Sequence, residues 1–256
     1  MARELNEVAP GVLVGVSRNY STTTTVLASG SEALVIDAAW MPDELEGLGE
    51  ELAGRGLAVV GGFSTHAHHD HLLWHPSLGD APRWAAPNTA RIAQEERETL
   101  VSFLGPDFPP DLVELMGRVR AVDGEIPETS VPAGFAPEIV AHDGHAPGHA
   151  GLWLANRRVL VAGDMLSDVE LPLPFYPDDL PAYLVALDLL APKVAEAEVV
   201  IPGHGSPGTD AQARLDADRR YLDDVIADRI PDDPRLGNPG MREEYEHLKQ
   251  IVERSR

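Results

Sequence analysis

The sequence predicts an α/β protein in which two packed sheets, or one split sheet, are covered by helices. Three observations lead to this class. Both halves of the chain open with short apolar strands and pass to helices, no low-complexity linker separates the halves, and strand ends carry histidines and aspartates. We therefore expect residues 1–256 to form a single domain, with a helical insertion at about 88–120 and C-terminal helices at about 210–256.

Short runs of apolar or β-branched residues bounded by turn residues predict the strands. In the first half they cover residues 11–16, 22–29, 32–40, 57–65 and 83–87. In the second half they cover residues 137–145, 151–155, 157–165 and 197–205. The run at 57–65 is uninterrupted by charge, which is typical of a strand buried on both faces.

Apolar residues at helical spacing predict the helices. They are expected at 41–56, in two pieces of 88–120, at about 180–194, and in two C-terminal segments, the second from about Met241. The break within 88–120 is predicted at "GPDFPPD", because proline and glycine end helices. This segment is interpreted either as structural padding or as a flap or wall over a pocket.

Charge and composition exclude several classes of function. The net charge of −22 argues against a nucleic-acid partner, because a phosphate track needs clustered Lys and Arg. The absence of cysteine excludes disulfides, thiolate ligands and a cysteine nucleophile. With no apolar run of the roughly 18 residues that a membrane helix needs and no evident signal peptide, we expect a cytoplasmic protein without a membrane partner. The oligomeric state is not indicated.

The motif "HAHHDH" at residues 66–71 follows the buried strand at 57–65. Residues two apart on an extended chain face the same way, so His66 and His68 can bind one ion. The chain then turns, which lets Asp70 and His71 point to a second position. Neutral imidazole and carboxylate suit Zn²⁺, and also Fe²⁺ or Mn²⁺.

Three later strand ends offer further ligands. In "DGHAPGHAG" we select His149 as the third ligand of the first ion and treat His145 as a bystander. Asp164 follows a glycine, which permits a close approach, so its carboxylate can bridge two cations. His204 stands in "IPGHG". His69, His75, His142 and His247 have no motif role.

These ordered motifs resemble the metallo-β-lactamase-fold superfamily of metal-dependent hydrolases. The match runs from Asp37 in "LVIDA" through "HAHHDH", "GHAPGHA" and "AGDM" to "IPGHG". The resemblance implies a four-layer αββα sandwich with a two-metal site along one edge. It implies that the first metal is held by His66, His68 and His149, and the second by Asp70, His71 and His204. Asp164 would bridge the two metals, and Asp37 would support the loop from behind.

The resemblance also implies an enzyme that binds two metal ions, expected to be zinc, with Fe or Mn as alternatives. A hydroxide between the ions would attack an ester, thioester or lactone carbonyl of a small molecule. Asp70 would orient the nucleophile and pass a proton to the leaving group, and Tyr176 is a candidate to assist the carbonyl oxygen. Leu171, Leu173 and Phe175 in "VELPLPFYPDD" are expected near an apolar substrate.

Other activities of the same superfamily stay open. Asp164 and the lack of cysteine count against a β-lactamase, and no basic cluster suits a glutathione thioester. A persulfide dioxygenase would use one iron held by His66, His149 and Asp164. A phosphodiesterase is a further alternative, and a non-catalytic binding protein is disfavoured by the intact ligand set.

Overall fold

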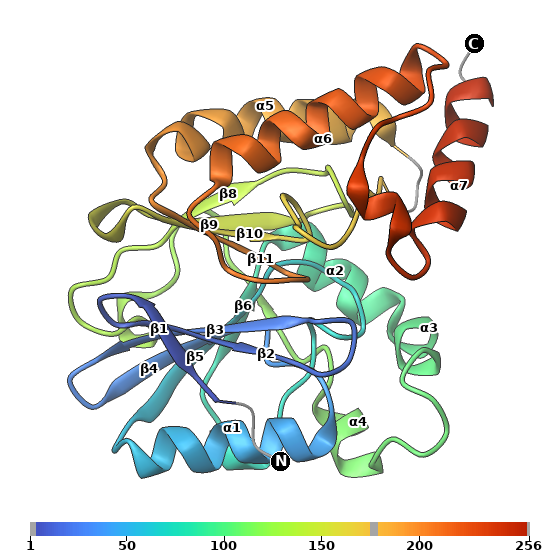
Figure 1. Ribbon diagram of the computed structural model, residues 1–256. Helices are drawn as coiled ribbons and strands as arrows, with labels where there is room; N and C mark the ends of the chain where they lie inside the picture. The colour runs from blue at the N-terminus through green and yellow to red at the C-terminus, as the bar shows by residue number, and fades with distance from the viewer. Residues whose placement is uncertain (1–3, 175–178, 255–256) are drawn as a thin grey trace.

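Two β-sheets pack face to face and carry helices on both outer surfaces in the computed structural model, which describes residues 4–174 and 179–254. Figure 1 shows α1 and α4 beneath the first sheet, and α5 and α6 above the second. The layers follow the order helix, sheet, sheet, helix. The αββα class predicted from the sequence is thus confirmed.

The first sheet takes its strands in chain order. They are β1 (Asn6–Ala9), β2 (Val12–Val16), β3 (Thr23–Ser29), β4 (Glu32–Ile36), β5 (Ala58–Ser64), β6 (Arg83–Ala85) and β7 (Arg120–Ala121). The first four are antiparallel neighbours, and the pairs from β4 to β7 are parallel. The sequence patterns did not predict β1, which is exposed or half-buried, nor β7, which has two residues. Neither has enough alternating apolar residues to mark a strand.

The second sheet has four strands in the order β11-β10-β9-β8. They are β8 (Glu138–Ala141), β9 (Ala150–Leu154), β10 (Val159–Gly163) and β11 (Val199–Pro202). Only the β10–β11 pair is parallel, and α5 lies in the connection between those two strands. This pairing brings the ends of β10 and β11 to the same edge of the sheet.

Seven α-helices lie in the described part of the chain. They are α1 (Pro42–Gly54), α2 (Pro87–Glu95), α3 (Arg97–Ser102), α4 (Pro110–Leu115), α5 (Leu180–Glu196), α6 (Ala211–Ile226) and α7 (Met241–Arg254). The segment predicted as two helical pieces forms three, because a break at Glu96 adds to the predicted one between α3 and α4. Among these helices none combines the length and apolar character that crossing a lipid bilayer requires.

Three apolar layers account for the packing of the sandwich. The central layer joins facing side chains of the two sheets, including Val14, Leu27, Ile36, Leu152, Val161 and Ile201. The outer layers join each sheet to its own helices, with Leu45 and Leu48 on one side and Leu187 and Leu222 on the other. Burying this apolar surface is the main favourable term in folding.

Backbone hydrogen bonds tie the two sheets together at the edge where the polar motifs lie. The N–H of Thr23 in β3 donates to the carbonyl oxygen of Gly203 at 2.7 Å. The N–H of Gly203 donates to the carbonyl oxygen of Gly163 at the end of β10, at 2.6 Å. The fold thereby holds the segments around Asp164 and His204 in a fixed relation.

Candidate metal centre

Seven histidine and aspartate side chains gather in two groups at the edge of the sandwich where backbone hydrogen bonds join the two sheets. The first group is His66, His68, His145 and Asp164, and the second is Asp70, His71 and His204. Within each group one potential ligand atom per residue lies within 4.8 Å of every other. Six of the seven are residues that the sequence motifs predicted, and His145 is the exception.

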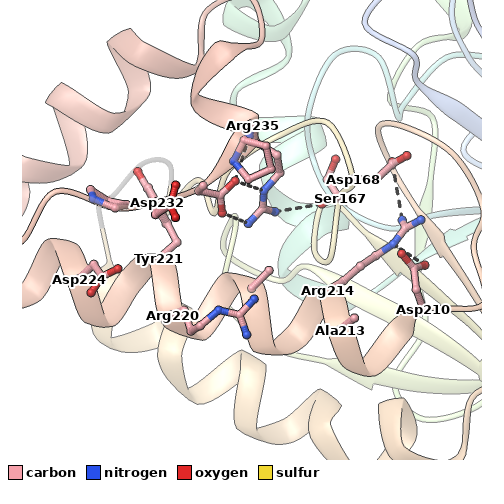
Figure 2. A pocket seen from close by; sticks show the side chains of 14 residues that line it. Ser167, Asp168, Asp210, Ala213, Arg214, Arg220, Tyr221, Asp224, Asp232 and Arg235 are labelled. Carbon is pink, nitrogen blue, oxygen red and sulfur yellow. Dashed lines mark hydrogen bonds and ion pairs between the residues drawn. The ribbon is translucent and has the colours of Figure 1, made fainter.

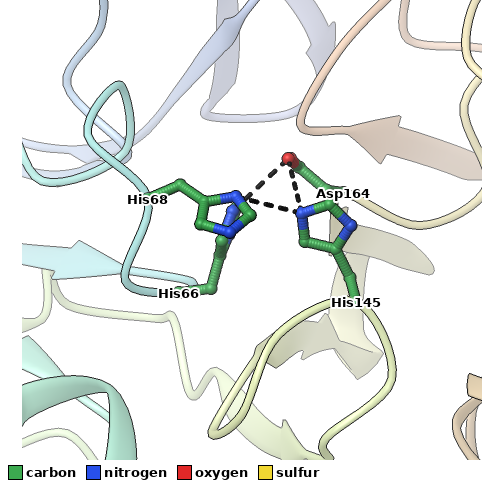
Figure 3. A group of neighbouring side chains, drawn as sticks. All are labelled: His66, His68, His145 and Asp164. Carbon is green, nitrogen blue, oxygen red and sulfur yellow. Dashed lines mark hydrogen bonds and ion pairs between the residues drawn. The ribbon is translucent and has the colours of Figure 1, made fainter. Parts of the chain in front are cut away.

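The first group combines the loop after β5, the loop between β8 and β9, and the end of β10 (Figure 3). His145 Nε2 lies 3.1 Å from His68 Nδ1 and 3.3 Å from Asp164 Oδ2. His66 Nε2 lies 3.4 Å from the same aspartate oxygen. Three imidazole nitrogens and one carboxylate oxygen therefore converge on one small volume.

The second group forms beside the first. His71 Nε2 lies 3.3 Å from His204 Nε2 and 3.5 Å from Asp70 Oδ2. His204 Nε2 is 3.4 Å from that Asp70 oxygen. Two nitrogens and one oxygen thus face one another in a second position.

Asp164 contacts both groups. Besides its contacts with His66 and His145, its Oδ1 lies 3.2 Å from His71 Nε2, and its Oδ2 lies 3.2 Å from His204 Nε2. Glycine at position 203 makes this placement feasible, because a Cβ there would stand 1.9 Å from Asp164 Oδ1. The carboxylate is placed between the two groups.

The side chains fit divalent metal ions by their chemistry. His66 Nε2 and Asp164 Oδ1 are buried and make no hydrogen bond in the described part of the chain. Buried polar atoms are rarely left without a partner, so such atoms in one cluster are explained by an ion that they would hold. Imidazole nitrogens with carboxylate oxygens form the donor set that zinc, iron or manganese takes.

His149 does not join the first group, which corrects the prediction made from the motif. Its Nε2 accepts a hydrogen bond from the backbone N–H of Asp164 at 3.0 Å, and its Nδ1 lies 3.2 Å from His142 Nε2. His145, interpreted as a bystander, takes the place instead. Its Nδ1 lies 2.9 Å from the carbonyl oxygen of Leu173, which leaves Nε2 to face the group. No sequence signal separates the two histidines, because both flank the same Pro-Gly turn.

Burial and neighbouring charge set the protonation of these side chains. Burial opposes charge on His204, but Asp164, Asp70 and Glu170 outweigh it and raise the pKa of His204 to about 10. The same balance, with Asp164, Asp70 and Asp37, raises the pKa of His71 well above its usual range. Burial lowers the pKa of His145 to about 3. A metal ion at the second position would therefore have to displace protons from His71 and His204.

Asp37 lies behind His71, at the end of β4. Its Oδ2 is 3.1 Å from His71 Nδ1 and accepts a hydrogen bond from Thr65 Oγ1 at 2.7 Å. Its Oδ1 accepts the backbone N–H of Thr65 at 2.8 Å. These contacts fix the ring so that Nε2 points toward Asp164 and His204. A metal-ligating histidine is usually held in this way, with its other ring nitrogen against a carboxylate or carbonyl group.

The loop between β2 and β3 supplies partners that the sequence patterns did not indicate. Thr22 Oγ1 donates to Asp70 Oδ2 at 3.2 Å, and His204 Nδ1 lies 2.9 Å from the carbonyl oxygen of Tyr20. The run of threonines at 22–25 indicates only a strand, so no sequence signal marks Thr22 as part of the site.

Two buried arginines hold the segment that follows Asp164, and both line a cavity of about 410 Å³ (Figure 2). Arg235 donates to the carbonyl oxygens of Ser167 and Glu170, each at 2.9 Å. Arg214 donates to the carbonyl oxygen of Leu166 at 3.3 Å. Ser167 Oγ in turn donates to the carbonyl oxygen of His204 at 2.7 Å. The C-terminal part of the chain thereby stabilises the loop that positions Asp164 and His204.

The predicted apolar substrate residues are not placed as one pocket. Leu171 and Leu173 are buried, and Leu171 packs in the core under the helices of the second sheet. Phe175 and Tyr176 lie outside the described residues. A cleft walled by α2 and α3 lies beside His68 instead.

The chain resembles known proteins in both sequence and structure. Residues 18–204 match the model of the family described as the metallo-beta-lactamase superfamily. The curated protein "Probable metallo-hydrolase YflN" of Bacillus subtilis strain 168 is 27% identical over 198 residues, which are 64% of this chain and 70% of that protein.

Two solved structures illustrate the likeness of fold. A metallo-beta-lactamase family protein from Thermus thermophilus superposes with a TM-score of 0.64 at 22% identity, covering 96% of this chain and 94% of its own. A metallo-beta-lactamase from Pontibacter korlensis gives a TM-score of 0.62 at 20% identity, covering 84% of this chain and 95% of its own. At these identities the structures establish a shared fold.

Proposed function

Because the chain belongs to the metallo-β-lactamase superfamily, whose members are mostly metal-dependent hydrolases, we propose that it is a dinuclear metal-dependent hydrolase of small molecules. The bond that it cleaves is an ester, thioester or lactone. The observation that carries the proposal is the carboxylate of Asp164, whose oxygens lie 3.2–3.4 Å from histidine nitrogens of both groups. A shared carboxylate is suited to two ions held side by side.

The residues that would hold the ions follow from the two groups. His66, His68 and His145 would hold the first, Asp70, His71 and His204 the second, and Asp164 both. Zinc is the proposed metal, and its usual nitrogen and oxygen ligands, histidine and carboxylate, are the donors present; iron or manganese would fit the same donors. Metal ions at such a site supply Lewis acidity and a nucleophile at neutral pH.

Asp70 is the residue that we assign to proton handling. Burial raises its pKa, but His71 and His204 outweigh that effect, so the pKa of Asp70 falls below its usual value and the carboxylate stays ionised. Thr22 Oγ1 donates to one of its oxygens and fixes its orientation. An ionised, oriented carboxylate can hold the proton taken from the nucleophile and pass it to the leaving group.

Two observations support a neutral carbonyl substrate over the other substrates of the superfamily. The chain carries a net charge of −22, which repels polyanionic substrates such as nucleic acids. The open space beside His68 is bounded mainly by apolar side chains of α2, α3 and the loop after His145. An ester, thioester or lactone with an aliphatic group is compatible with such surroundings.

The proposal is tested on purified protein whose metal content has been measured. Zinc, iron and manganese per chain are quantified, and the same sample is assayed against ester, thioester, lactone, phosphodiester and β-lactam panels. We expect two zinc ions per chain and turnover of the carbonyl esters, with Asp164→Asn reducing both. One iron per chain together with oxidation of a persulfide, and no ester turnover, would overturn the proposal.

A further inference from the structure

A cleft of about 580 Å³ is lined by residues of α2 and α3 and by His68. His68 also belongs to the first group of potential ligands, so the cleft adjoins that group. Ala146 and Pro147, which follow His145, form part of the opposite wall. A substrate held at the histidines would therefore extend one of its substituents into this space.

The wall of the cleft is mainly apolar. Its apolar side chains are Ala67, Ile92, Leu100, Phe103, Ala146 and Pro147. Phe103 stands out because 62% of it is exposed, whereas large apolar residues are usually covered. Its ring lies 5.5 Å from that of His69, which also lines the cleft. A bound aliphatic group would cover Phe103 and gain free energy from the apolar contact.

One side chain of the cleft is formally charged. Glu96 stands at the break between α2 and α3, with an exposed carboxylate, and no Lys or Arg lines the cleft in the described part of the chain. The remaining polar residues of the wall are His68, His69 and Thr99. A carboxylate on the substrate would find no Lys or Arg side chain in the described lining and would meet the negative charge of Glu96.

We propose that this cleft binds the uncharged aliphatic group of the substrate, and that Glu96 selects against substrates that carry a carboxylate on that group. The inference rests on the proposed hydrolase function and adds its substrate class: esters, thioesters or lactones with a neutral aliphatic chain of several carbons. The volume lies within the range of about 300–1,000 Å³ typical of small-molecule sites. Phe103 and Glu96 are the residues that determine specificity.

The test compares p-nitrophenyl acetate, butyrate and hexanoate with mono-p-nitrophenyl adipate, whose chain has the length of hexanoate but ends in a carboxylate. For the wild-type enzyme we expect kcat/KM to rise about fourfold for each added methylene, as the chain enters the cleft. The kcat/KM for mono-p-nitrophenyl adipate should be at least about tenfold lower than that for p-nitrophenyl hexanoate, because Glu96 repels the free carboxylate of the adipate ester.

Two variants and a matched control assign the effect to the cleft. Phe103→Ala, at an exposed position, should lower the ratio of kcat/KM for hexanoate to kcat/KM for acetate, because the longer chain has more apolar contact with the Phe103 ring to lose. Glu96→Lys should raise the adipate-to-hexanoate ratio by at least about tenfold. Glu98→Lys makes the same charge change on α3 outside the cleft and should shift that ratio less than about twofold. Equal ratios for Glu96→Lys and Glu98→Lys would contradict the role of Glu96.

A binding measurement separates failure of the cleft from failure of the hydrolase proposal. 2-Octanone is neutral, apolar and not hydrolysable, and its binding to wild type and Phe103→Ala is followed by ligand-observed NMR. If no ester is cleaved but 2-octanone binds in a manner that depends on Phe103, the cleft assignment stands and the proposed function fails. If esters are cleaved without chain-length preference and 2-octanone does not bind, the cleft proposal is overturned.

Discussion

The backbone N–H of Asp164 donates a 3.0 Å hydrogen bond to Nε2 of His149. That bond occupies the ring nitrogen that a metal would need, and it holds the peptide of Asp164 from behind. Gly163 allows this approach, since a Cβ there would lie 2.4 Å from the same nitrogen. His149 is therefore a positioning residue for the shared carboxylate, whereas His145 directs its Nε2 toward that carboxylate at 3.3 Å.

Matched substitutions of these two histidines should have unequal effects on metal binding. His145→Gln removes a proposed ligand, so the affinity for the first ion should fall by more than the roughly 10–100-fold that loss of an outer partner costs. The glutamine of His149→Gln can still accept a hydrogen bond from the N–H of Asp164. Its loss of affinity for the first ion should therefore lie within or below that range. Metal titration with a competing chelator measures both values. A larger loss for His149→Gln would restore the assignment made from the motif.

The sequence predicts most of this centre because its residues lie at the ends of recognisable strands. His66 and His68 follow the buried β5, and Asp164 and His204 follow β10 and β11, so chain position already brings them to one edge. The choice between His145 and His149 depends on which ring meets Leu173 and which meets the Asp164 amide. Those partners lie 15 or more residues away, so local pattern carries no information about them.

The same limit applies to the wall of the cleft. The sequence pattern of residues 88–120 predicts helices. That α2 and α3 form a wall of the cleft depends on their packing beside the loop after β5. The break at Glu96 has no Gly or Pro to mark it, since the sequence there is "QEERE". Helix periodicity alone therefore misses the feature that places Glu96 in the cleft.

Asp37 should control the second metal position through His71. Asp37→Asn keeps the size of the side chain but removes the charge that faces His71 Nδ1 at 3.1 Å. We expect the affinity for the second ion to fall about 10–100-fold, because the ring loses the partner that fixes its orientation and basicity. Asp80→Asn, an exposed site away from the centre, is the control and should leave affinity unchanged. Equal affinities for the wild type and Asp37→Asn would refute this role.

Asp70 should affect turnover beyond any effect on metal content. With both ions restored by added metal, Asp70→Asn should lower kcat by about 10²–10⁴-fold, the usual contribution of a positioned acid–base group. Ser167→Ala removes no acid–base group. It loses the hydrogen bond to the carbonyl oxygen of His204 and those accepted from the N–H groups of Val169 and Glu170, and it should lower kcat less than about tenfold. Steady-state assays on metal-quantified samples provide the comparison. Full turnover by Asp70→Asn with both metals bound would exclude the proposed proton transfer.

His142 should make the metal-free protein sensitive to acid. Burial lowers the pKa of His142 to about 4, so between that value and its ordinary value near 6.5 the unfolded chain binds more protons than the folded one. The stabilising effect of the neutral ring is complete above pH 6.5 and is lost as the pH falls toward 4. When the pH is lowered from 7.5 to 5, the unfolding free energy of the wild type should therefore fall by about 2 kcal/mol more than that of His142→Gln.

Urea unfolding of both metal-free proteins at the two pH values measures this difference. An NMR titration of the imidazole gives the pKa directly and does not depend on the variant folding normally. An identical pH dependence of stability in the two proteins, or a His142 pKa near 6.5, would show that burial does not govern this ring.

Arg235 should be the strongest link between the C-terminal segment and the metal centre. Its side chain is 7% exposed and pairs with Asp218 at 2.7 Å and Asp233 at 2.8 Å, while also donating to two carbonyl oxygens of the loop after Asp164. Arg235→Ala leaves Asp218 buried without its cation, and breaking such a pair costs about 3–5 kcal/mol. Burial already raises the pKa of Asp218 to about 6, so part of that cost is relieved by protonation at acidic pH.

Asp218→Asn distinguishes the charge from the loop contacts. It removes the buried carboxylate but leaves Arg235 bonded to Asp233, Ser167 and Glu170, so we expect a smaller loss of unfolding free energy and normal metal affinity. Arg235→Ala, by contrast, should weaken metal binding as well, because Ser167 then no longer holds the carbonyl oxygen of His204 in place. Denaturant unfolding and metal titration of the two variants test both statements. Metal affinity unchanged in a folded Arg235→Ala protein would mean that the loop positions Asp164 and His204 without this arginine.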